Sequence, residues 1–266
     1  MEQGCNIIEC RGLALAYGQD TILAHVDLDI MSGWLLPFVG ANGAGKSTLF
    51  KALLGLLPPR SGEIRRLWGK ARPGYVPQQQ HIDPIFPVNV RSIVGMGLYP
   101  ECGFLRLLSR EQKERLDTTL SRFGLAEHQK KTFAELSGGL RQKTLIARAV
   151  IGNSPIIFLD EPVAGLDAAS EEAVLELLID LCRKQGKTVL IAHHRLEDLS
   201  RLSPIVCLVG HGKAEVLPSE TAYEMNLCDW SSDVCSSDLK YAGYSLWRFS
   251  VAACWLPHAA LLESSC

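Results

Sequence analysis

The sequence predicts an α/β fold with an inserted helical segment, and three observations favour it. Short apolar runs of strand length alternate with helical stretches along most of the chain. One such run, residues 35–39, leads into a glycine-rich loop followed by a helical stretch at 46–54. From about 88 to 153 the pattern becomes helical, which indicates a helical subdomain inserted into the α/β core.

The N-terminal region is expected to contain a partly antiparallel group of strands. The helix at 46–54 is expected to stop at Pro58 and Pro59, because proline cannot continue a helix. Pro37 is unusual inside the strand that precedes the glycine-rich loop, since proline lacks the backbone N–H that a ladder uses. It marks either the beginning of that strand or a local kink. The early strands are predicted at residues 7–15, 26–30 and 62–67.

The later elements carry clear start and stop signals. Ser109 followed by Gln112 fits a capping box at the start of a helix. Asp167 is suited to cap a long helix over 168–184, and Gly186 is suited to end it. The later strands are predicted at 156–159, 188–192 and 205–209.

Composition narrows the class of protein. The chain is 47% hydrophobic and 21% charged, which is typical of a globular protein. Its net charge of -2 gives no electrostatic case for binding nucleic acid. No apolar run approaches the ~20 residues that cross a bilayer, so a membrane role is expected to come through a partner. The nine cysteines show no zinc spacing and are expected to be reduced thiols in a cytosolic protein.

The C-terminal segment breaks the pattern of the rest of the chain. Residues 229–239, which begin Asp229-Trp230-Ser231-Ser232-Asp233, resemble the translation of a common sequencing-library adapter. We interpret 218–228 as the end of the native chain and 229–266 as an artefactual or disordered tail. A real serine-rich linker is the alternative.

The glycine-rich loop fits the phosphate-binding motif G-x-x-x-x-G-K-[ST]. Its glycines allow backbone N–H groups to converge on phosphates, and the following helix adds a positive dipole. Lys46 is expected to reach the β- and γ-phosphates, and Ser47 to ligate magnesium. The residues expected to hold the nucleotide here are Gly40, Asn42, Gly43, Gly45, Lys46, Ser47 and Thr48.

Two carboxylates, Asp160 and Glu161, end the apolar run at 156–159. A buried parallel strand delivers such side chains to the carboxyl edge of the sheet, where open α/β sheets bind ligands. With a phosphate-binding loop earlier in the chain, this pair is predicted to take part in nucleotide hydrolysis.

A second candidate anion site is formed by Leu136, Ser137, Gly138 and Gly139. Ser137 can cap the helix-forming run that follows, and the glycines expose backbone N–H groups at its N-terminus. One nucleotide does not need two such cradles in the same subunit, because the phosphate-binding loop already holds its phosphates.

These motifs together resemble the ATP-binding cassette (ABC) ATPases, in which LSGG of one subunit closes over ATP held by another. The resemblance implies ATP and Mg²⁺ as cofactors and a head-to-tail pair of identical chains. It also implies a RecA-like P-loop NTPase core with an antiparallel β subdomain and an inserted α-helical subdomain. The expected domain covers residues 5–217, with its core at 5–87 and 154–217 and the helical subdomain at 88–153.

The resemblance also implies roles for the candidate residues. Asp160 holds magnesium together with Ser47 and Gln78, and Glu161 is the general base for the attacking water. His193 contacts the γ-phosphate, and Lys46 and Gln78 complete the catalytic set. Gln78 also links the two subdomains and senses magnesium and the γ-phosphate. Gln79 is a weak rival for the role of Gln78, and His194 beside His193 raises a paired-histidine metal site. The remaining implied contacts are Tyr17 on adenine, Asp167 between the two active sites, and Ser137, Gly138 and Gly139 on the ATP of the partner.

The sequence departs from the family pattern directly after the LSGG motif. Leu140-Arg141-Gln142-Lys143 stands where Gln-Gln-Gln-Arg is usual, so different polar contacts are expected behind the motif.

The subclass is indicated by residues 82–90 and by Met96-Gly97-Leu98-Tyr99, which are similar to importers of manganese, zinc or iron. Leu98 replaces the arginine that is commoner there, and iron-siderophore importers have a related region. The implied partners are integral membrane permease subunits and an extracytoplasmic substrate-binding protein, with the chain peripheral on the inner, cytoplasmic face. The alternatives are an exporter ATPase, a non-transport ABC ATPase acting on nucleic acid or ribosomes, and an inactive binding module.

Overall fold

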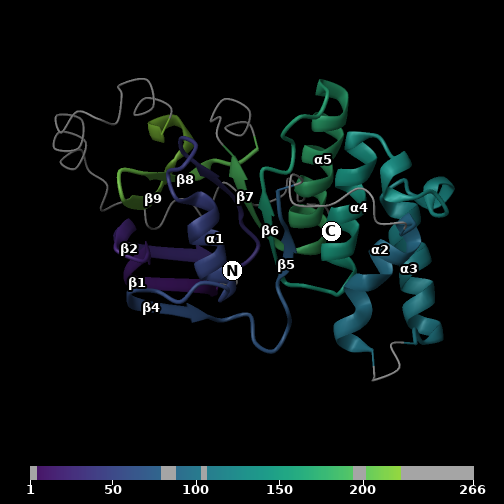
Figure 1. Ribbon diagram of the computed structural model, residues 1–266, viewed down its shortest axis with the longest axis horizontal. Coiled ribbons are helices and arrows are strands. Elements are labelled where there is room, and N and C mark those ends of the chain that lie inside the picture. Colours follow the sequence, from purple (N-terminus) through teal and green to yellow (C-terminus); the bar gives the residue numbers. More distant parts are fainter. Residues whose placement is uncertain (1–4, 79–87, 103–106, 194–201, 223–266) are drawn as a thin grey trace, which may run out of the picture.

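The computed structural model in Figure 1 describes residues 5–78, 88–102, 107–193 and 202–222. Its larger sheet has the strand order β5-β6-β7-β3-β8-β9. The first five strands of this order run parallel, and β9 pairs antiparallel with β8 at one edge. The α/β prediction is therefore confirmed. The strands are β3 (Leu35–Val39), β5 (Gly74–Val76), β6 (Ile156–Asp160), β7 (Thr188–His193), β8 (Ile205–Gly210) and β9 (Lys213–Pro218).

Side chains of the buried strands alternate between two apolar cores, one on each face of the sheet. Leu36 and Phe38 pack on the face that carries helix α1 (Lys46–Leu54). Leu35 and Val39 pack on the opposite face, with α4 (Gly138–Ile151) and α5 (Ala168–Gln185). Burial on both faces explains why these strands are continuous apolar runs without polar alternation.

A second, smaller sheet has the order β2-β1-β4 and is antiparallel. Its strands are β1 (Asn6–Tyr17), β2 (Asp20–Met31) and β4 (Ser61–Arg66). The predicted antiparallel group is confirmed, although β2 begins at Asp20, six residues before the predicted start, because the hairpin turns tightly after Tyr17. This sheet packs into the same core as α1.

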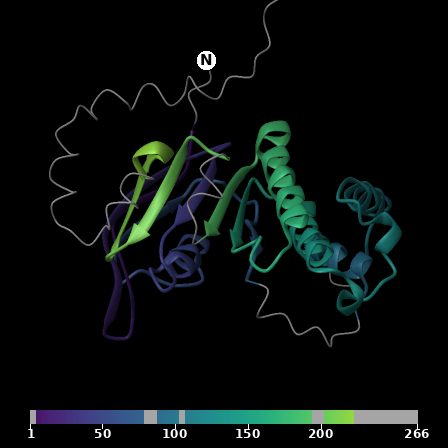
Figure 2. The same ribbon diagram turned by 90° about the horizontal axis from the view of Figure 1, so that it is seen from above.

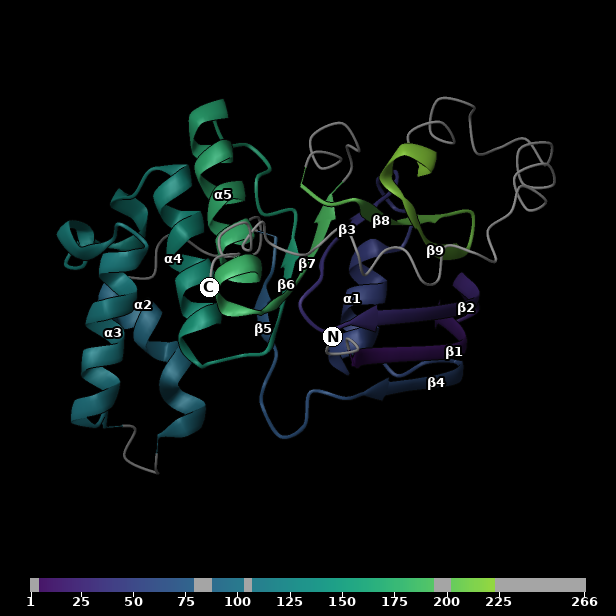
Figure 3. The same cartoon turned by 180° about the vertical axis from the view of Figure 1, so that it is seen from behind.

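The smaller sheet and the helical segment lie at opposite ends of the molecule (Figure 2). Seen from behind, the larger sheet runs between them (Figure 3). The helical segment comprises α2 (Val90–Gly95), η2 (Met96–Glu101), α3 (Arg110–Arg122), η3 (Ala126–His128), η4 (Phe133–Glu135) and α4. The division of the chain into domains stays a prediction.

Two strands of the larger sheet were not predicted. β5 has only three residues, which is too short for a recognisable pattern. β9 exposes Lys213 and Glu215, and these charged residues interrupt the apolar run by which the other strands were recognised. Both are edge strands, and edge strands need less apolar surface than central ones.

Pro37 lies in the middle of β3, so it does not mark the beginning of the strand. The ladder between β3 and β7 runs through Pro37, which is opposite Ile191. The ladder with β8 pairs only Phe38 and Val39, so it begins after the proline. The missing donor is therefore tolerated because pairing with β8 starts later.

The predicted bounds of α1 are confirmed, but the structure corrects the residue that ends the helix. The helix ends at Leu54 with Gly55 as its C-cap, in the left-handed region at φ 82°. The N–H of Gly55 donates to the carbonyls of Ala52 and Lys51. Gly55 thus ends the helix before Pro58 is reached, since glycine adopts this conformation without Cβ strain.

The predicted caps are confirmed. Ser109 Oγ accepts from the backbone N–H of Gln112 at 3.2 Å, and Gln112 Oε1 accepts from the N–H of Ser109 at 2.9 Å. Asp167 caps α5, which ends at Gly186 with φ 63°.

The five cysteines within the described ranges are free thiols, as expected. Burial raises the pKa of Cys10 to about 12 and of Cys182 to about 11. Among the helices of the described part, no apolar stretch is long enough to cross a bilayer.

The interpretation of residues 229–266 lies outside the described residues. Packed structure continues at least to Ala222, which is fully buried in the core on the face of the larger sheet that also carries α4 and α5. The expected domain end at 217 stays a prediction.

The close packing of η2 against α4 leads to a stability prediction. A Cβ on Gly97 would lie 2.1 Å from the backbone oxygen of Arg148. Gly97→Ala is therefore expected to destabilise the fold by ~2 kcal/mol or more, through overpacking against backbone. This corresponds to a fall in Tm of about 4–8 °C, measurable by thermal unfolding followed by circular dichroism.

Gly210→Ala is the matched control, because a Cβ on Gly210 would meet nothing within 4 Å. An equal Tm for the two variants would contradict the packing described for η2.

Candidate functional site

The carboxyl ends of four neighbouring strands bring most of the predicted residues together. In the order β5-β6-β7-β3, Gln78 follows β5, Asp160 ends β6, His193 ends β7 and Gly40 follows β3. Asp160 lies opposite Ala192, and His193 lies opposite Val39. Parallel strands place these ends on one edge of the sheet, which is where open α/β sheets bind ligands.

The phosphate-binding loop is held tightly against its neighbours. A Cβ on Gly40 would lie 1.9 Å from the backbone oxygen of Val209, so only glycine fits where the loop passes β8. Gly45 has φ 102°, and a Cβ there would meet Ile22 of β2 at 2.8 Å. These contacts fix the loop as a backbone-lined cradle at the N-terminus of α1.

Lys46 lies inside this cradle. Its Nζ donates to the backbone oxygens of Gly40 at 2.7 Å and Ala41 at 2.9 Å. Burial lowers the pKa of Lys46, while the nearby carboxylates of Glu161 and Asp160 act in the opposite direction. A buried ammonium bonded to loop carbonyls, beside two carboxylates, fits a site for a phosphate chain and a cation.

Asp160 is buried and accepts a hydrogen bond from the hydroxyl of Ser47. Burial raises its pKa, and the hydrogen bond from Ser47 opposes that rise. A carboxylate and a hydroxyl in contact form an oxygen donor set of the kind that Mg²⁺ uses. The predicted pairing of Asp160 with Ser47 therefore occurs in the structure, and it fits a magnesium ion.

Glu161 and Gln78 are in direct contact. Gln78 Nε2 donates to Glu161 Oε2 at 2.7 Å. Glu161 has φ 49°, which is unusual for a residue other than glycine, and its N–H donates to Ala192 at 2.9 Å. A backbone in this left-handed conformation, held by a hydrogen bond to the neighbouring strand, is a feature that clusters at active sites.

His193 is only 3% exposed and ends β7 directly beside the strand that enters the loop. The residue thus lies between the end of β6, which carries Asp160, and the end of β3, which leads into the loop. The alternatives at Gln79 and His194 lie outside the described residues. Within the described part, no group of three or more metal-ligating side chains is found.

Tyr17 ends β1 at the hairpin whose second strand touches the loop. The phenol is 46% exposed, and Ile22 of the same hairpin contacts Gly45. An exposed ring beside the loop is positioned to stack on a base.

The LSGG motif begins α4, and Ser137 is its N-cap. Ser137 Oγ accepts from the N–H of Leu140 at 3.4 Å. Gly139 packs on Ser170 of α5, and Gly138 packs near Leu166. The sequence did not single out Ser170, although its spacing from Asp167 matches a capping pair.

The phosphate-binding loop and the LSGG motif do not converge in one chain. α1 packs into the core on one face of the larger sheet, whereas α4 and α5 pack into the core on the other face. Helices α4 and α5 both begin near the carboxyl edge of the sheet. α5 starts shortly after β6 ends, and Gly139 at the start of α4 packs on Ser170 of α5. The two predicted anion sites therefore lie at the starts of helices that pack on different faces of the sheet.

The departure after LSGG has a structural explanation at Arg141. Its guanidinium donates to the backbone oxygens of Phe133 at 3.1 Å and Ala134 at 2.7 Å. It also lies 5.7 Å from the centroid of the Phe133 ring. Arg141 thus fastens the turn that leads into the motif.

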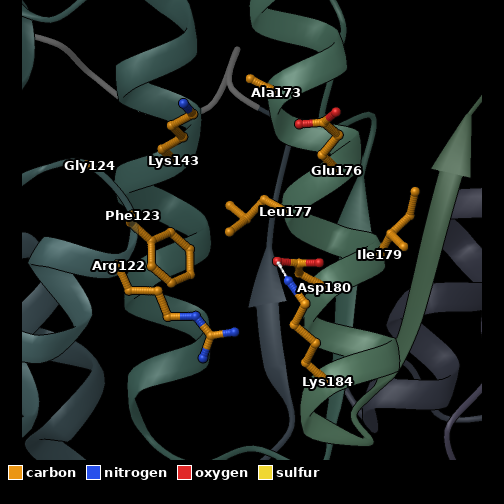
Figure 4. Close-up of a pocket in the computed structure, with 10 residues that line it drawn as sticks. All are labelled: Arg122, Phe123, Gly124, Lys143, Ala173, Glu176, Leu177, Ile179, Asp180 and Lys184. Carbon is orange, nitrogen blue, oxygen red and sulfur yellow. Dashed lines mark hydrogen bonds and ion pairs between the residues drawn. The ribbon is translucent and has the colours of Figure 1, made fainter. Parts of the chain in front are cut away.

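A separate groove of about 630 Å³ lies between the end of α3, α4 and α5 (Figure 4). Arg122 and Lys143 line it from α3 and α4, and Glu176 and Asp180 from α5, where Asp180 pairs with Lys184. Its lining includes none of the residues predicted to bind ATP.

Comparisons with known proteins agree with this geometry. Residues 23–164 match the model of the ABC transporter family. A manganese transport system ATP-binding protein, MntB of Bacillus subtilis (strain 168), is 36% identical over 222 residues, covering 81% of this chain and 88% of that protein. The zinc transport system ATP-binding protein TroB of Treponema pallidum (strain Nichols) is 38% identical over 207 residues, covering 76% of this chain and 77% of that protein.

A solved metal-chelate type ABC transporter in an inward-facing conformation superimposes with a TM-score of 0.74. It is 29% identical and covers 81% of this chain and 84% of its own. The expected RecA-like ABC ATPase fold is confirmed by this similarity. The family match spans more than half of the chain, and the chain therefore belongs to the ABC transporter family, as a subunit that binds and hydrolyses ATP for transport.

Proposed function

We propose that this chain powers the import of a metal ion, manganese, zinc or iron, through a membrane permease. The observation that carries the ATPase part is the alignment of Lys46, Asp160 and Glu161 on one sheet edge, with the LSGG motif on another face. The cargo class is supported by relatives named for manganese, zinc and chelated iron transport.

In this proposal the loop from Gly40 to Thr48 holds the phosphates of ATP, and Tyr17 stacks on the adenine. Asn42 and Gly43 contribute to the cradle together with Gly45. Ser47, Asp160 and Gln78 would hold Mg²⁺, which supplies charge neutralisation on the phosphate oxygens when bound. The contact between Ser47 and Asp160 supports this assignment.

Glu161 accepts the proton of the attacking water, and Gln78 holds its carboxylate in place through the 2.7 Å hydrogen bond. His193 and Lys46 stabilise the negative charge that develops on the γ-phosphate. Most of the rate enhancement then comes from positioning and charge stabilisation by groups already fixed by the sheet.

Two copies of the chain form the complete sites. Each copy offers Ser137, Gly138 and Gly139 to the ATP bound by the other, and Asp167 lies between the two sites. Closure and reopening of the pair drive the permease, which docks against the helical segment near Gln78. The chain then works as a peripheral subunit on the cytoplasmic face, with an extracytoplasmic binding protein delivering the metal.

Co-purification with the permease, followed by uptake in vesicles, tests the cargo. We expect ATP-dependent accumulation of Mn²⁺, Zn²⁺ or a simple ferric chelate, and loss of that uptake in the Lys46→Ala variant. Uptake of an iron-siderophore or haem complex instead would favour the competing importer class. ATP-driven release of metal would contradict import.

A further inference from the structure

The LSGG motif packs closely against Ser170 at the start of α5 and against Leu166 just before it. A Cβ on Gly139 would lie 2.7 Å from Ser170 Oγ and 2.9 Å from Ser170 Cβ. A Cβ on Gly138 would lie 3.1 Å from Leu166 Cδ2. The backbone of α4 therefore approaches α5 at a distance that only glycine allows.

Ser170 is fastened on its other side to Asp167. Its N–H donates to Asp167 Oδ1 at 2.9 Å, and its hydroxyl donates to Asp167 Oδ2 at 2.7 Å. One side chain thus contacts both the LSGG helix and the loop that ends at Asp167.

The residues around Ser170 differ in how far they are exposed to solvent. Ser137, Gly138 and Asp167 are exposed, whereas Gly139 is buried against Ser170. The exposed groups are free to meet a second chain, while Gly139, which packs on the partly exposed Ser170, is buried.

An ordinary capping pair in the same chain gives a comparison. At the start of α3, Gln112 bonds back to Ser109 in a similar way. That pair lies in the helical segment, away from the residues assigned to ATP. At Ser170, by contrast, the capping contact is joined to an LSGG glycine.

We propose that Ser170 is a positioning residue that locks the Asp167 loop to the LSGG motif, so that both move as one body. The inference rests on the proposed pairing of two chains. Asp167 belongs to the contact between the two active sites, and LSGG completes the site of the partner. A rigid connection between them transmits the state of one site to the other.

The test compares Ser170→Ala with Gln112→Ala in the full-length chain. Both remove the side-chain hydrogen bond of a capping pair, and Gln112→Ala also removes a bond from Cys102 Sγ at 3.7 Å. Thermal unfolding checks that their stabilities match. In Ser170→Ala we expect kcat for ATP hydrolysis to fall about 5-fold or more, which is the effect of losing a typical coupling free energy between two sites. We also expect a lower Hill coefficient for ATP. The Kd for ATP, measured by calorimetry, should change less than about 2-fold, because the phosphate-binding loop is untouched.

Gln112→Ala is expected to keep the wild-type kcat and Hill coefficient. Wild-type kinetics in Ser170→Ala would overturn the inference, as would equal losses in both variants. Failure of the proposed function has a different signature, since the wild-type chain itself would then lack ATP-dependent pairing.

Discussion

Lys46→Ala is expected to abolish tight ATP binding. The ammonium lies in the cradle, 2.7 Å from Gly40 O and 2.9 Å from Ala41 O, where the phosphates of ATP are expected. Charge-assisted hydrogen bonds contribute ~1.5–3 kcal/mol each, so loss of the two that the ammonium is expected to donate to the β- and γ-phosphates weakens binding by about 100-fold or more. Isothermal titration calorimetry with ATP measures this directly.

Lys51→Ala is the matched control, because Lys51 lies one turn further along α1 and is exposed. It should bind ATP almost as tightly as the wild type, after both variants are shown to unfold at similar temperatures. Retained affinity in Lys46→Ala would contradict the assignment of the loop.

Glu161→Gln is expected to stop hydrolysis while leaving ATP bound. The amide keeps the shape of the side chain and an oxygen that accepts from Gln78, but it takes no proton from water. General base catalysis contributes roughly 10²–10⁴-fold, and kcat should fall by that factor. The chain should then accumulate as an ATP-bound dimer, seen by light scattering as a doubling of mass.

Glu172→Gln provides the control, since this glutamate is exposed on α5 and should leave both kcat and the monomer-dimer balance unchanged. A Glu161→Gln chain that stays monomeric at saturating ATP would contradict the head-to-tail pairing.

The parts of the site that are contiguous in sequence could be predicted, because their chemistry is local. The loop around Lys46 and the carboxylates after β6 each follow an apolar strand, and the position of a strand end fixes their place in the fold. Caps at Ser109 and Asp167 were predictable for the same reason, since each requires only three or four neighbouring residues.

Contacts between distant segments could not be read in this way. The hydrogen bond from Gln78 to Glu161 joins residues 83 positions apart, and it depends on β5 pairing beside β6. β5 itself is too short to give a pattern. Ser170 was missed because its role depends on how closely α4 approaches α5, which no local pattern encodes. The bounds of α1 were predicted correctly, but the residue that ends the helix is Gly55 and not the prolines.

The separation of the two cradles on opposite faces of the sheet has a consequence for how ATP is consumed in a cell. In the proposed scheme a single chain carries the phosphate-binding loop of one active site and the LSGG motif of another. It therefore hydrolyses ATP only when it pairs with another copy. At low abundance the hydrolysis rate then rises with the square of chain concentration. Copies that are not brought together by a permease then hydrolyse little ATP. The separation of the two sites limits ATP hydrolysis without transport, and no inhibitor is needed.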